Sequence, residues 1–215
     1  MIPWPEAEWR AMQEEGLAWQ AKFRARRGAG TLFLLDGASC SGKSSLVDRL
    51  TAAPGSVDLV PRYSTRERRQ DDHRRREYIF VAPEAFRARA QAGAFIEYRD
   101  FLFGMSYGLP WAEAFAPLLE GRPALGVINL GNVEYVKTLV PEAVTVLVDA
   151  SLDTIRHRLI ARGVNTSAQI EERLANASRV HDFRKFYDHV VTNEEGGLDA
   201  AESTLRDLIA SRAAT

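Results

Sequence analysis

The sequence is almost without cysteine. Cys40 is the only one among 215 residues, so no disulfide can form within one chain, which is typical of a reducing compartment. No apolar run approaches the roughly 18 residues that suggest a membrane-spanning helix. The N-terminal residues 1–16, MIPWPEAEWRAMQEEG, are acidic and lack the apolar centre of a secretory signal. We therefore expect a cytoplasmic protein without a membrane partner.

An excess of charge of one sign is also missing. The chain has 28 Lys and Arg against 29 Asp and Glu, a formal net charge of -1. The chain as a whole is therefore not attracted to nucleic acid, and we expect no nucleic-acid partner. Any anion must be bound by a local cluster of basic groups. The length allows one large domain with a sizeable core.

Strand-like and helix-like segments alternate along most of the chain. After a helix expected over 5–27, with a weak point at Gly16, we expect strands at 31–36, 77–81, 94–99, 123–130, 143–150 and 189–193. Helices are expected at 43–53, 83–93, 111–121, 152–163, 167–183 and 198–212. This alternation predicts an α/β layer fold with a parallel sheet.

The same pattern suggests a division of the chain. Residues 31–60 and 111–215 would form the core, and the strongly charged block 61–110 would be an inserted subdomain. Residues 1–30 would be an N-terminal helical extension. That extension is interpreted either as a helix packed on the core or as an arm for dimerisation or regulation.

Residues 37–45, GASCSGKSS, follow an expected buried strand and begin an expected helix. The spacing of Gly37, Gly42, Lys43 and Ser44 is that of a phosphate-binding loop. Its backbone N–H groups surround phosphate oxygens, the lysine reaches the terminal phosphates, and the serine hydroxyl ligates Mg²⁺. We expect ATP and Mg²⁺ as cofactors, with Ser44 as the metal ligand. The expected ATP-binding residues here are Gly37, Ser39, Ser41, Gly42, Lys43, Ser44 and Ser45.

A phosphate-binding loop does not by itself name a reaction. The Asn-Lys-x-Asp string that reads guanine in switch GTPases does not occur, and the chain is short for a motor core, so a small kinase is favoured. Asp36, which precedes the loop, has two open interpretations. It either assists the metal or acts as a base, or it stabilises the turn. Cys40 is expected to have no chemistry of its own.

Residues 61–81, PRYSTRERRQDDHRRREYIFV, are rich in arginine. Converging guanidinium groups bind phosphate in a bidentate manner, so two or three of these arginines would form a phosphate site. A solvated loop whose charges pair with each other is the alternative for Arg68, Arg74 and Arg75. A nucleic-acid patch is a third interpretation, weakened by the interleaved acids and the few aromatic residues.

The order and spacing of several motifs resemble those of the guanylate kinases. The motifs are GASCSGKSSL, STRERR, EYIFV, GAFIEY, SYGLP, RLIARG, IEERL and YDHVVTN, and together they cover roughly residues 31–212. The resemblance implies a P-loop kinase three-layer fold with a helical lid at about 155–185. It implies that Arg66, Arg69, Tyr78 and Tyr107 hold the phosphate of the acceptor. Lid arginines that stabilise the transferring phosphoryl group would be Arg158, Arg162 and Arg173, and Asn193 would lie near the donor base.

The resemblance fails where the family reads guanine. Glu97 matches the family glutamate, but Leu109 and Arg62 replace two hydroxyl residues, while Val127 and Asn129 replace two acids. The substrate-binding set expected from the sequence is therefore Arg62, Arg66, Arg69, Tyr78, Glu97, Tyr107 and Asn129. Val127 also removes a carboxylate that would support Mg²⁺. The phosphate half of the acceptor site is retained while the base half is altered.

Three functions follow from this pattern. The first is an ATP-dependent nucleoside monophosphate kinase, a phosphotransferase with GMP as the family default. The second is the same reaction on a modified nucleotide, a sugar phosphate of the ribose bisphosphate type, or a phosphorylated natural product. The third is a non-catalytic module that binds a phosphorylated ligand. The lysine and serine of the phosphate-binding loop, Lys43 and Ser44, argue against the third.

Overall fold

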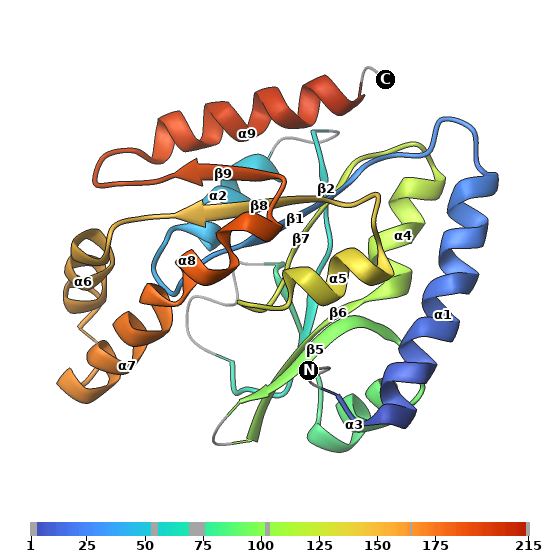
Figure 1. Cartoon of the computed structure of the whole chain (residues 1–215), viewed down its shortest axis with the longest axis horizontal. Coiled ribbons are helices and arrows are strands. Elements are labelled where there is room, and N and C mark those ends of the chain that lie inside the picture. The colour runs from blue at the N-terminus through green and yellow to red at the C-terminus, as the bar shows by residue number, and fades with distance from the viewer. Residues whose placement is uncertain (1–3, 53–55, 69–75, 102–103, 164, 214–215) are drawn as a thin grey trace.

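The structure is a computed structural model that describes residues 4–52, 56–68, 76–101, 104–163 and 165–213. In this part of the chain the strands form two sheets, one of five strands and one of four. Helices lie on both faces of the larger sheet (Figure 1). Among the described residues, none of the helices combines the length and the apolar character needed to cross a membrane.

The larger sheet is parallel throughout, as the sequence predicts. Its strand order is β2 (Asp58–Leu59), β7 (Ala124–Val127), β1 (Leu32–Asp36), β8 (Val144–Asp149) and β9 (His189–Thr192). The central strands β1, β7 and β8 are almost entirely buried, which explains their continuous apolar composition. The carboxyl ends of these strands meet at one edge, where the segments that follow them come together.

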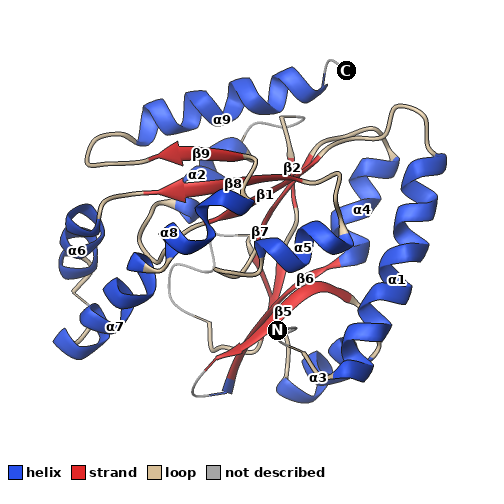
Figure 2. Cartoon of the chain, in the orientation of Figure 1, coloured by secondary structure: helices blue, strands red, loops and turns tan. Residues whose placement is uncertain are grey.

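Two hydrophobic clusters cover the two faces of this sheet, which confirms the three-layer fold. Because side chains alternate along a strand, Phe33 and Leu35 of β1 join the cluster of α2 (Lys43–Leu50) and α9 (Leu198–Ala213). The opposite cluster contains Leu32 and Leu34 with α4 (Trp111–Leu119) and α5 (Val133–Leu139). The sequence analysis did not predict α5. In Figure 2 the helices are blue and the strands are red, so the helices on either side of the larger sheet can be distinguished from it.

The smaller sheet is built from residues 62–110. Its order is β4 (Tyr78–Phe80), β3 (Arg62–Ser64), β6 (Met105–Pro110) and β5 (Phe95–Phe101). Strands β3 and β4 are parallel, and β6 is antiparallel to both β3 and β5. The sequence predicted strands near β4 and β5 and missed β3 and β6. Helix α3 (Pro83–Gln91) precedes β5 in the chain.

Helix α1 (Glu6–Ala25) lies against α4 (Figure 1) and is continuous through Gly16, so the expected weak point is wrong. A Cβ atom at Gly16 would lie 2.7 Å from the ring of Trp111, so the glycine permits close helix contact. The side chain of Gln20 donates a hydrogen bond to the carbonyl of Leu139. Helix α1 is therefore packed on the core, as one of its two interpretations held.

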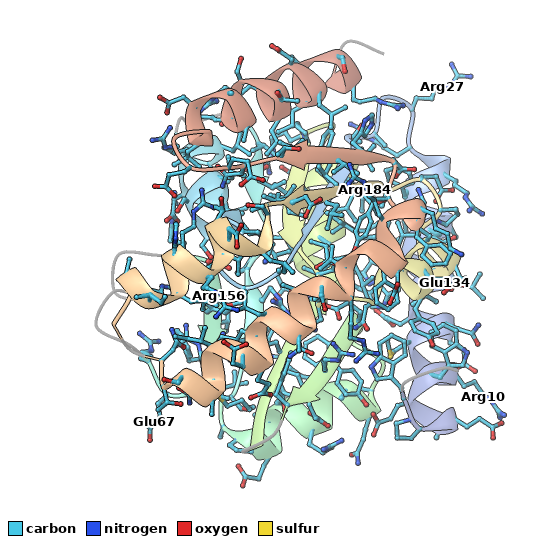
Figure 3. All side chains as sticks on the ribbon, turned by 60° about the vertical axis from the view of Figure 1, so that its left-hand side comes forward. Arg10, Arg27, Glu67, Glu134, Arg156 and Arg184 are labelled. Atoms are coloured by element: carbon cyan, nitrogen blue, oxygen red, sulfur yellow. The ribbon has the colours of Figure 1, made fainter. Side chains whose placement is uncertain are left out.

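The segment after β8 contains α6 (Leu152–Ala161) and α7 (Ser167–Ser178), followed by the short α8 (Val180–Phe183). The single helix predicted over 167–183 is therefore two helices. Helix α7 begins with a capping box, in which Thr166 and Gln169 bond each other's backbone N–H groups. Arg156, labelled on α6 in Figure 3, lies 2.7 Å from a carboxylate oxygen of α7.

Candidate functional site

The phosphate-binding loop joins β1 to α2 as predicted. Gly42 is the N-cap of α2 and has a φ of 104°, a conformation that other residues rarely adopt. A Cβ atom at Gly42 would lie 2.0 Å from Nδ2 of Asn193. The loop can therefore close against Asn193 only with glycine at this position. Asn193 Nδ2 donates to the Ser41 carbonyl at 2.7 Å.

Lys43 folds back over this loop. Its Nζ donates to the carbonyls of Gly37 and Ala38 at 2.5 and 2.8 Å. Burial lowers the pKa of Lys43, while the nearby Asp36 carboxylate opposes that change. The ammonium group is thus held at the mouth of the loop, where the dipole of α2 presents its positive end.

Asp36 lies behind the loop and is fully buried. Its Oδ1 accepts a hydrogen bond from the Gly37 N–H at 2.6 Å, and its Oδ2 accepts one from the Tyr187 hydroxyl. Burial raises the pKa of Asp36 to about 6, although these hydrogen bonds and Lys43 favour ionisation. Of the two interpretations of Asp36, stabilisation of the turn is the one that these contacts support.

A cleft of about 770 Å³ opens between the phosphate-binding loop and the smaller sheet. It brings together most of the site residues expected from the sequence: Gly37, Ser39, Gly42, Lys43, Ser44, Ser45, Arg62, Arg66, Tyr78, Tyr107, Asn129, Arg158, Arg162, Arg173 and Asn193. Two expected residues, Ser41 and Glu97, are fully buried and do not line it. Arg69 lies outside the described residues.

Basic and aromatic groups gather at the end of the cleft formed by the smaller sheet. The guanidinium of Arg66 lies over the ring of Tyr78, 4.8 Å from its centroid, and over Phe80 at 4.9 Å. The rings of Tyr78 and Tyr107 are 6.0 Å apart. Burial raises the pKa of Tyr78, as does the neighbouring Glu77, so its hydroxyl stays protonated and can donate.

Glu97 belongs to a buried polar network behind the cleft. Its Oε2 accepts hydrogen bonds from the side-chain amides of Asn129 and Asn132 at 2.7 and 2.6 Å. Its Oε1 lies 3.7 Å from Nη2 of Arg62, which donates to Oδ1 of Asn129 at 2.6 Å. Burial raises the pKa of Glu97, while Arg62 and the two amides oppose that change.

Three arginines of the α6–α7 segment reach the phosphate-binding loop. Arg158 donates to the carbonyls of Cys40 and Ser41 at 3.3 and 3.4 Å, and to the Glu194 carbonyl at 2.9 Å. Arg173 Nη1 donates to the Ser39 hydroxyl at 2.8 Å, and Arg162 Nη1 lies 3.8 Å from the Cys40 sulfur. The helices after β8 therefore place cationic groups beside the loop.

Comparison with known proteins agrees with this geometry. The guanylate kinase family model matches residues 29–212. The chain belongs to the guanylate kinase family. A guanylate kinase of Corynebacterium diphtheriae is 32% identical over 185 residues, which cover 85% of this chain and 96% of that protein. A guanylate kinase of Deinococcus radiodurans is 35% identical over 185 residues, covering 83% and 74%.

Solved structures agree on the fold. The crystal structure of guanylate kinase from Anaplasma phagocytophilum superposes with a TM-score of 0.65 at 20% identity, covering 85% of this chain and 86% of that one. As a member of the guanylate kinase family, this chain is a phosphotransferase of the nucleoside monophosphate kinase type. None of these similarities supports a sugar phosphate acceptor or a non-catalytic module.

The sequence analysis missed two residues of this guanylate kinase family site. Glu77 lines the cleft and is 3% exposed, yet it looked like one of many charges in the arginine-rich block. Its position directly before the aromatic and apolar strand β4 is the signal that could have marked it. Asn132, which holds Glu97, begins the helix that was not predicted.

Proposed function

We propose that this protein transfers the γ-phosphoryl group of ATP to the phosphate of a nucleoside monophosphate, with GMP as the acceptor. The observation that carries the proposal is that one cleft is lined both by the loop around Lys43 and by the group formed by Arg66, Tyr78 and Tyr107. One side offers backbone N–H groups and an ammonium, and the other offers a guanidinium and phenols. Both are suited to phosphate.

At the donor side, the loop and Lys43 would hold the phosphates of ATP, together with the serines that line the cleft. Asn193, packed against the loop, would support its shape near the donor base. The assignments at this side are Gly37, Ser39, Ser41, Gly42, Lys43, Ser44, Ser45 and Asn193, of which Ser41 is a buried residue of the loop itself.

Mg²⁺ fits the donor side with few protein ligands. Ser44 lines the cleft at the start of α2, whereas no group of three His, Cys, Asp or Glu suited to a metal occurs among the described residues. Because Mg²⁺ usually keeps several waters and binds phosphate oxygens, a single hydroxyl is a sufficient protein ligand. When bound, the ion neutralises charge on the β- and γ-phosphates.

At the acceptor side, Arg66 would form charge-assisted hydrogen bonds with the acceptor phosphate, and the hydroxyls of Tyr78 and Tyr107 would donate to it. Arg69 is assigned here from the sequence alone. These groups position an oxygen of the acceptor phosphate for attack on the γ-phosphorus. No strong general base is needed, because that oxygen is already anionic.

In the transfer, the acceptor oxygen forms a bond to the γ-phosphorus while the bond to the bridging oxygen of ATP breaks, and ADP leaves. Negative charge spreads over the phosphoryl oxygens in the transition state. Arg158, Arg162 and Arg173 lie beside the loop and would neutralise this charge. Movement of the lid toward the cleft would exclude water, which competes as an acceptor.

The test is formation of ADP and GDP from ATP and GMP, measured together, with an Arg66→Ala variant. Loss of hydrogen bonds to a charged group costs about 1.5–3 kcal/mol, so we expect the KM for GMP to rise by at least about tenfold. The KM for ATP should stay unchanged. The matched control is Arg10→Ala, an exposed arginine on α1 labelled in Figure 3.

Two outcomes would contradict the proposal. One is the absence of ADP formation with any nucleoside monophosphate. The other is an equal rise of the KM values for GMP and ATP in the Arg66→Ala variant, since this would show that Arg66 does not bind the acceptor specifically.

A further inference from the structure

Helix α1 lies outside the part of the chain that the family model matches, which begins at residue 29. It nevertheless contacts both parts of the molecule, namely α4 and α5 beside the larger sheet, and α3 and β5 at the smaller sheet. In Figure 1 it extends from α3 at its N-terminal end to α4. A helix of 20 residues is about 30 Å long, which is enough to connect the two parts.

The N-terminal end of α1 is attached to β5, an outer strand of the smaller sheet. The indole Nε1 of Trp4, which precedes the helix, donates to the Tyr98 carbonyl at 2.8 Å. The carboxylate of Glu8 accepts a hydrogen bond from the Tyr98 hydroxyl and lies 3.8 Å from a guanidinium nitrogen of Arg87 on α3. Both the backbone and the side chain of Tyr98 are therefore held from this end of the helix.

This attachment is close and includes the core. The ring of Trp4 lies 5.9 Å from that of Tyr98 and 5.6 Å from that of Tyr135 on α5, so one side chain contacts both parts. Gly93, in the turn between α3 and β5, has a φ of 71°, and a Cβ atom there would lie 2.3 Å from the carbonyl oxygen of Ala11. A larger residue at Gly93 would collide with α1, so the glycine allows the turn to approach the helix.

The C-terminal half of α1 is attached to the core alone in its strongest contacts. The rings of Trp19 and Phe23 lie 6.1 and 5.8 Å from the ring of Phe115 on α4. The side chain of Gln20 donates to the carbonyl of Leu139, at the end of α5. The helix is thus fixed at one end to the smaller sheet and at the other end to the helices of the larger sheet.

The strand that α1 holds is paired with the strand that carries Tyr107. In the register of β5 and β6, Tyr98 lies opposite Gly108 and Arg99 lies opposite Tyr107. Successive side chains of a strand point to opposite faces, so Tyr107 lies on the face opposite to Tyr98 and lines the cleft. A displacement of β5 would therefore displace the acceptor side of the cleft.

We propose that α1 is a brace that fixes the smaller sheet relative to the larger one, with Trp4 and Glu8 as positioning residues for the acceptor phosphate. This inference rests on the proposed nucleoside monophosphate kinase function. Among the described residues that line the cleft, none belongs to α1, so the helix acts through β5. By raising the fraction of molecules whose acceptor side is correctly placed, the brace raises the apparent affinity for the acceptor.

The donor side should not depend on the brace. The phosphate-binding loop leads into α2, which packs with Phe33 and Leu35 on one face of the larger sheet. Met12 of α1 belongs to the hydrophobic cluster on the opposite face. Loosening of α1 should therefore weaken binding of the acceptor and leave binding of ATP unchanged.

Two variants release opposite ends of the helix. Glu8→Ala removes the carboxylate that holds β5 and α3, and Phe23→Ala removes a ring that packs on α4. The matched controls are Glu14→Ala and Leu17→Ala, which shorten exposed side chains of the same helix. Leu205→Ala, a buried position in the cluster of α9, controls for a general loss of stability.

The first readout is amide hydrogen exchange of the free proteins. In both Glu8→Ala and Phe23→Ala, the amides of β5 and β6 should exchange at least about fivefold faster than in the wild type, because the smaller sheet opens more often. Phe23→Ala is the decisive variant, since its ring packs on α4 at the end of the helix away from β5. Unchanged exchange of β5 and β6 in this variant overturns the brace, as does equal acceleration by Leu17→Ala.

The second readout is calorimetry with GMP alone and with a non-hydrolysable ATP analogue and Mg²⁺. GMP should bind at least about threefold more weakly to Glu8→Ala and Phe23→Ala, with the affinity for the ATP analogue unchanged. Unchanged GMP affinity in these folded variants, an equal loss of affinity for both ligands, or the same selective loss in Leu205→Ala overturns the positioning role. A wild type that binds no GMP refutes the proposed function instead, while the exchange rates still decide whether α1 is a brace.

Discussion

Replacing Asp36 with asparagine should change how the stability of the protein depends on pH. Asp36 is fully buried behind the phosphate-binding loop, and burial raises its pKa from 3.8 to about 6. This difference corresponds to about 3 kcal/mol between the two protonation states. An asparagine at this position cannot ionise, but its oxygen can still accept from the Gly37 N–H.

The direction follows from proton binding. Between pH 3.8 and about 6, the native state keeps a proton on Asp36 that the unfolded state has released. Stability therefore falls as the pH rises through this range, and the whole contribution of about 3 kcal/mol is lost above it. Integration between pH 4.5 and 7 gives a fall of about 2 kcal/mol from this one carboxylate.

Urea unfolding of the wild type and the Asp36→Asn variant, at several pH values from 4.5 to 7, measures the effect. The free energy of unfolding of the wild type minus that of the variant should fall by about 2 kcal/mol over the range. Burial also raises the pKa of Glu8 and Glu97, but those groups are present in both proteins. A difference that stays constant or rises with pH would refute the reasoning.

Three further predictions concern the loop, the lid and α1. Lys43→Ala should lower kcat by at least about 100-fold in an ADP-release assay, because a group that stabilises transition-state charge is lost. A smaller fall would show that Lys43 does not stabilise the transition state of the transfer. Arg173→Ala should lower kcat by a similar factor of about 100, with both KM values within a few-fold in steady-state kinetics; a change in KM alone would indicate a binding role. Gly16→Ala should lower the melting temperature, because its Cβ would lie 2.7 Å from the Trp111 ring. The overpacking should destabilise the protein by about 1–3 kcal/mol, which exceeds the gain of about 1 kcal/mol in helix propensity from glycine to alanine. The control in the calorimetric measurement is Gln13→Ala, a substitution at an exposed position of α1. A melting temperature raised by Gly16→Ala would contradict the close contact.

The features that depend on local sequence could be predicted. A strand, a glycine-bounded loop and a helix follow each other within residues 31–50, and each is specified by residues close in the chain. The parallel sheet followed from the alternation of apolar strands and helices. The resemblance to a known family brought Arg66, Tyr78 and Tyr107 together, which no local pattern could have done.

The features that depend on tertiary contacts could not be predicted. Glu97 was expected to face the acceptor, and its burial behind Asn129 depends on Asn132 at the start of α5. Gly16 was read as a helix-weakening residue because its partner, Trp111, is distant in the chain. Glu77 lies in a sequence block where many charges occur, and only packing shows that it is a buried residue in the lining of the cleft.

The central claim is that one cleft binds the phosphates of ATP at the loop around Lys43 and the phosphate of GMP at the opposite side, next to Arg66. Calorimetry with a bisubstrate inhibitor, in which adenosine and guanosine are joined through one polyphosphate chain, tests this claim most directly. We expect one inhibitor per chain, bound at least about 100-fold more tightly than ATP or GMP alone, because the second half binds intramolecularly. The affinity should fall in both the Lys43→Ala and the Arg66→Ala variants. An inhibitor that binds no more tightly than ATP, or that loses affinity in only one of these variants, would contradict the account.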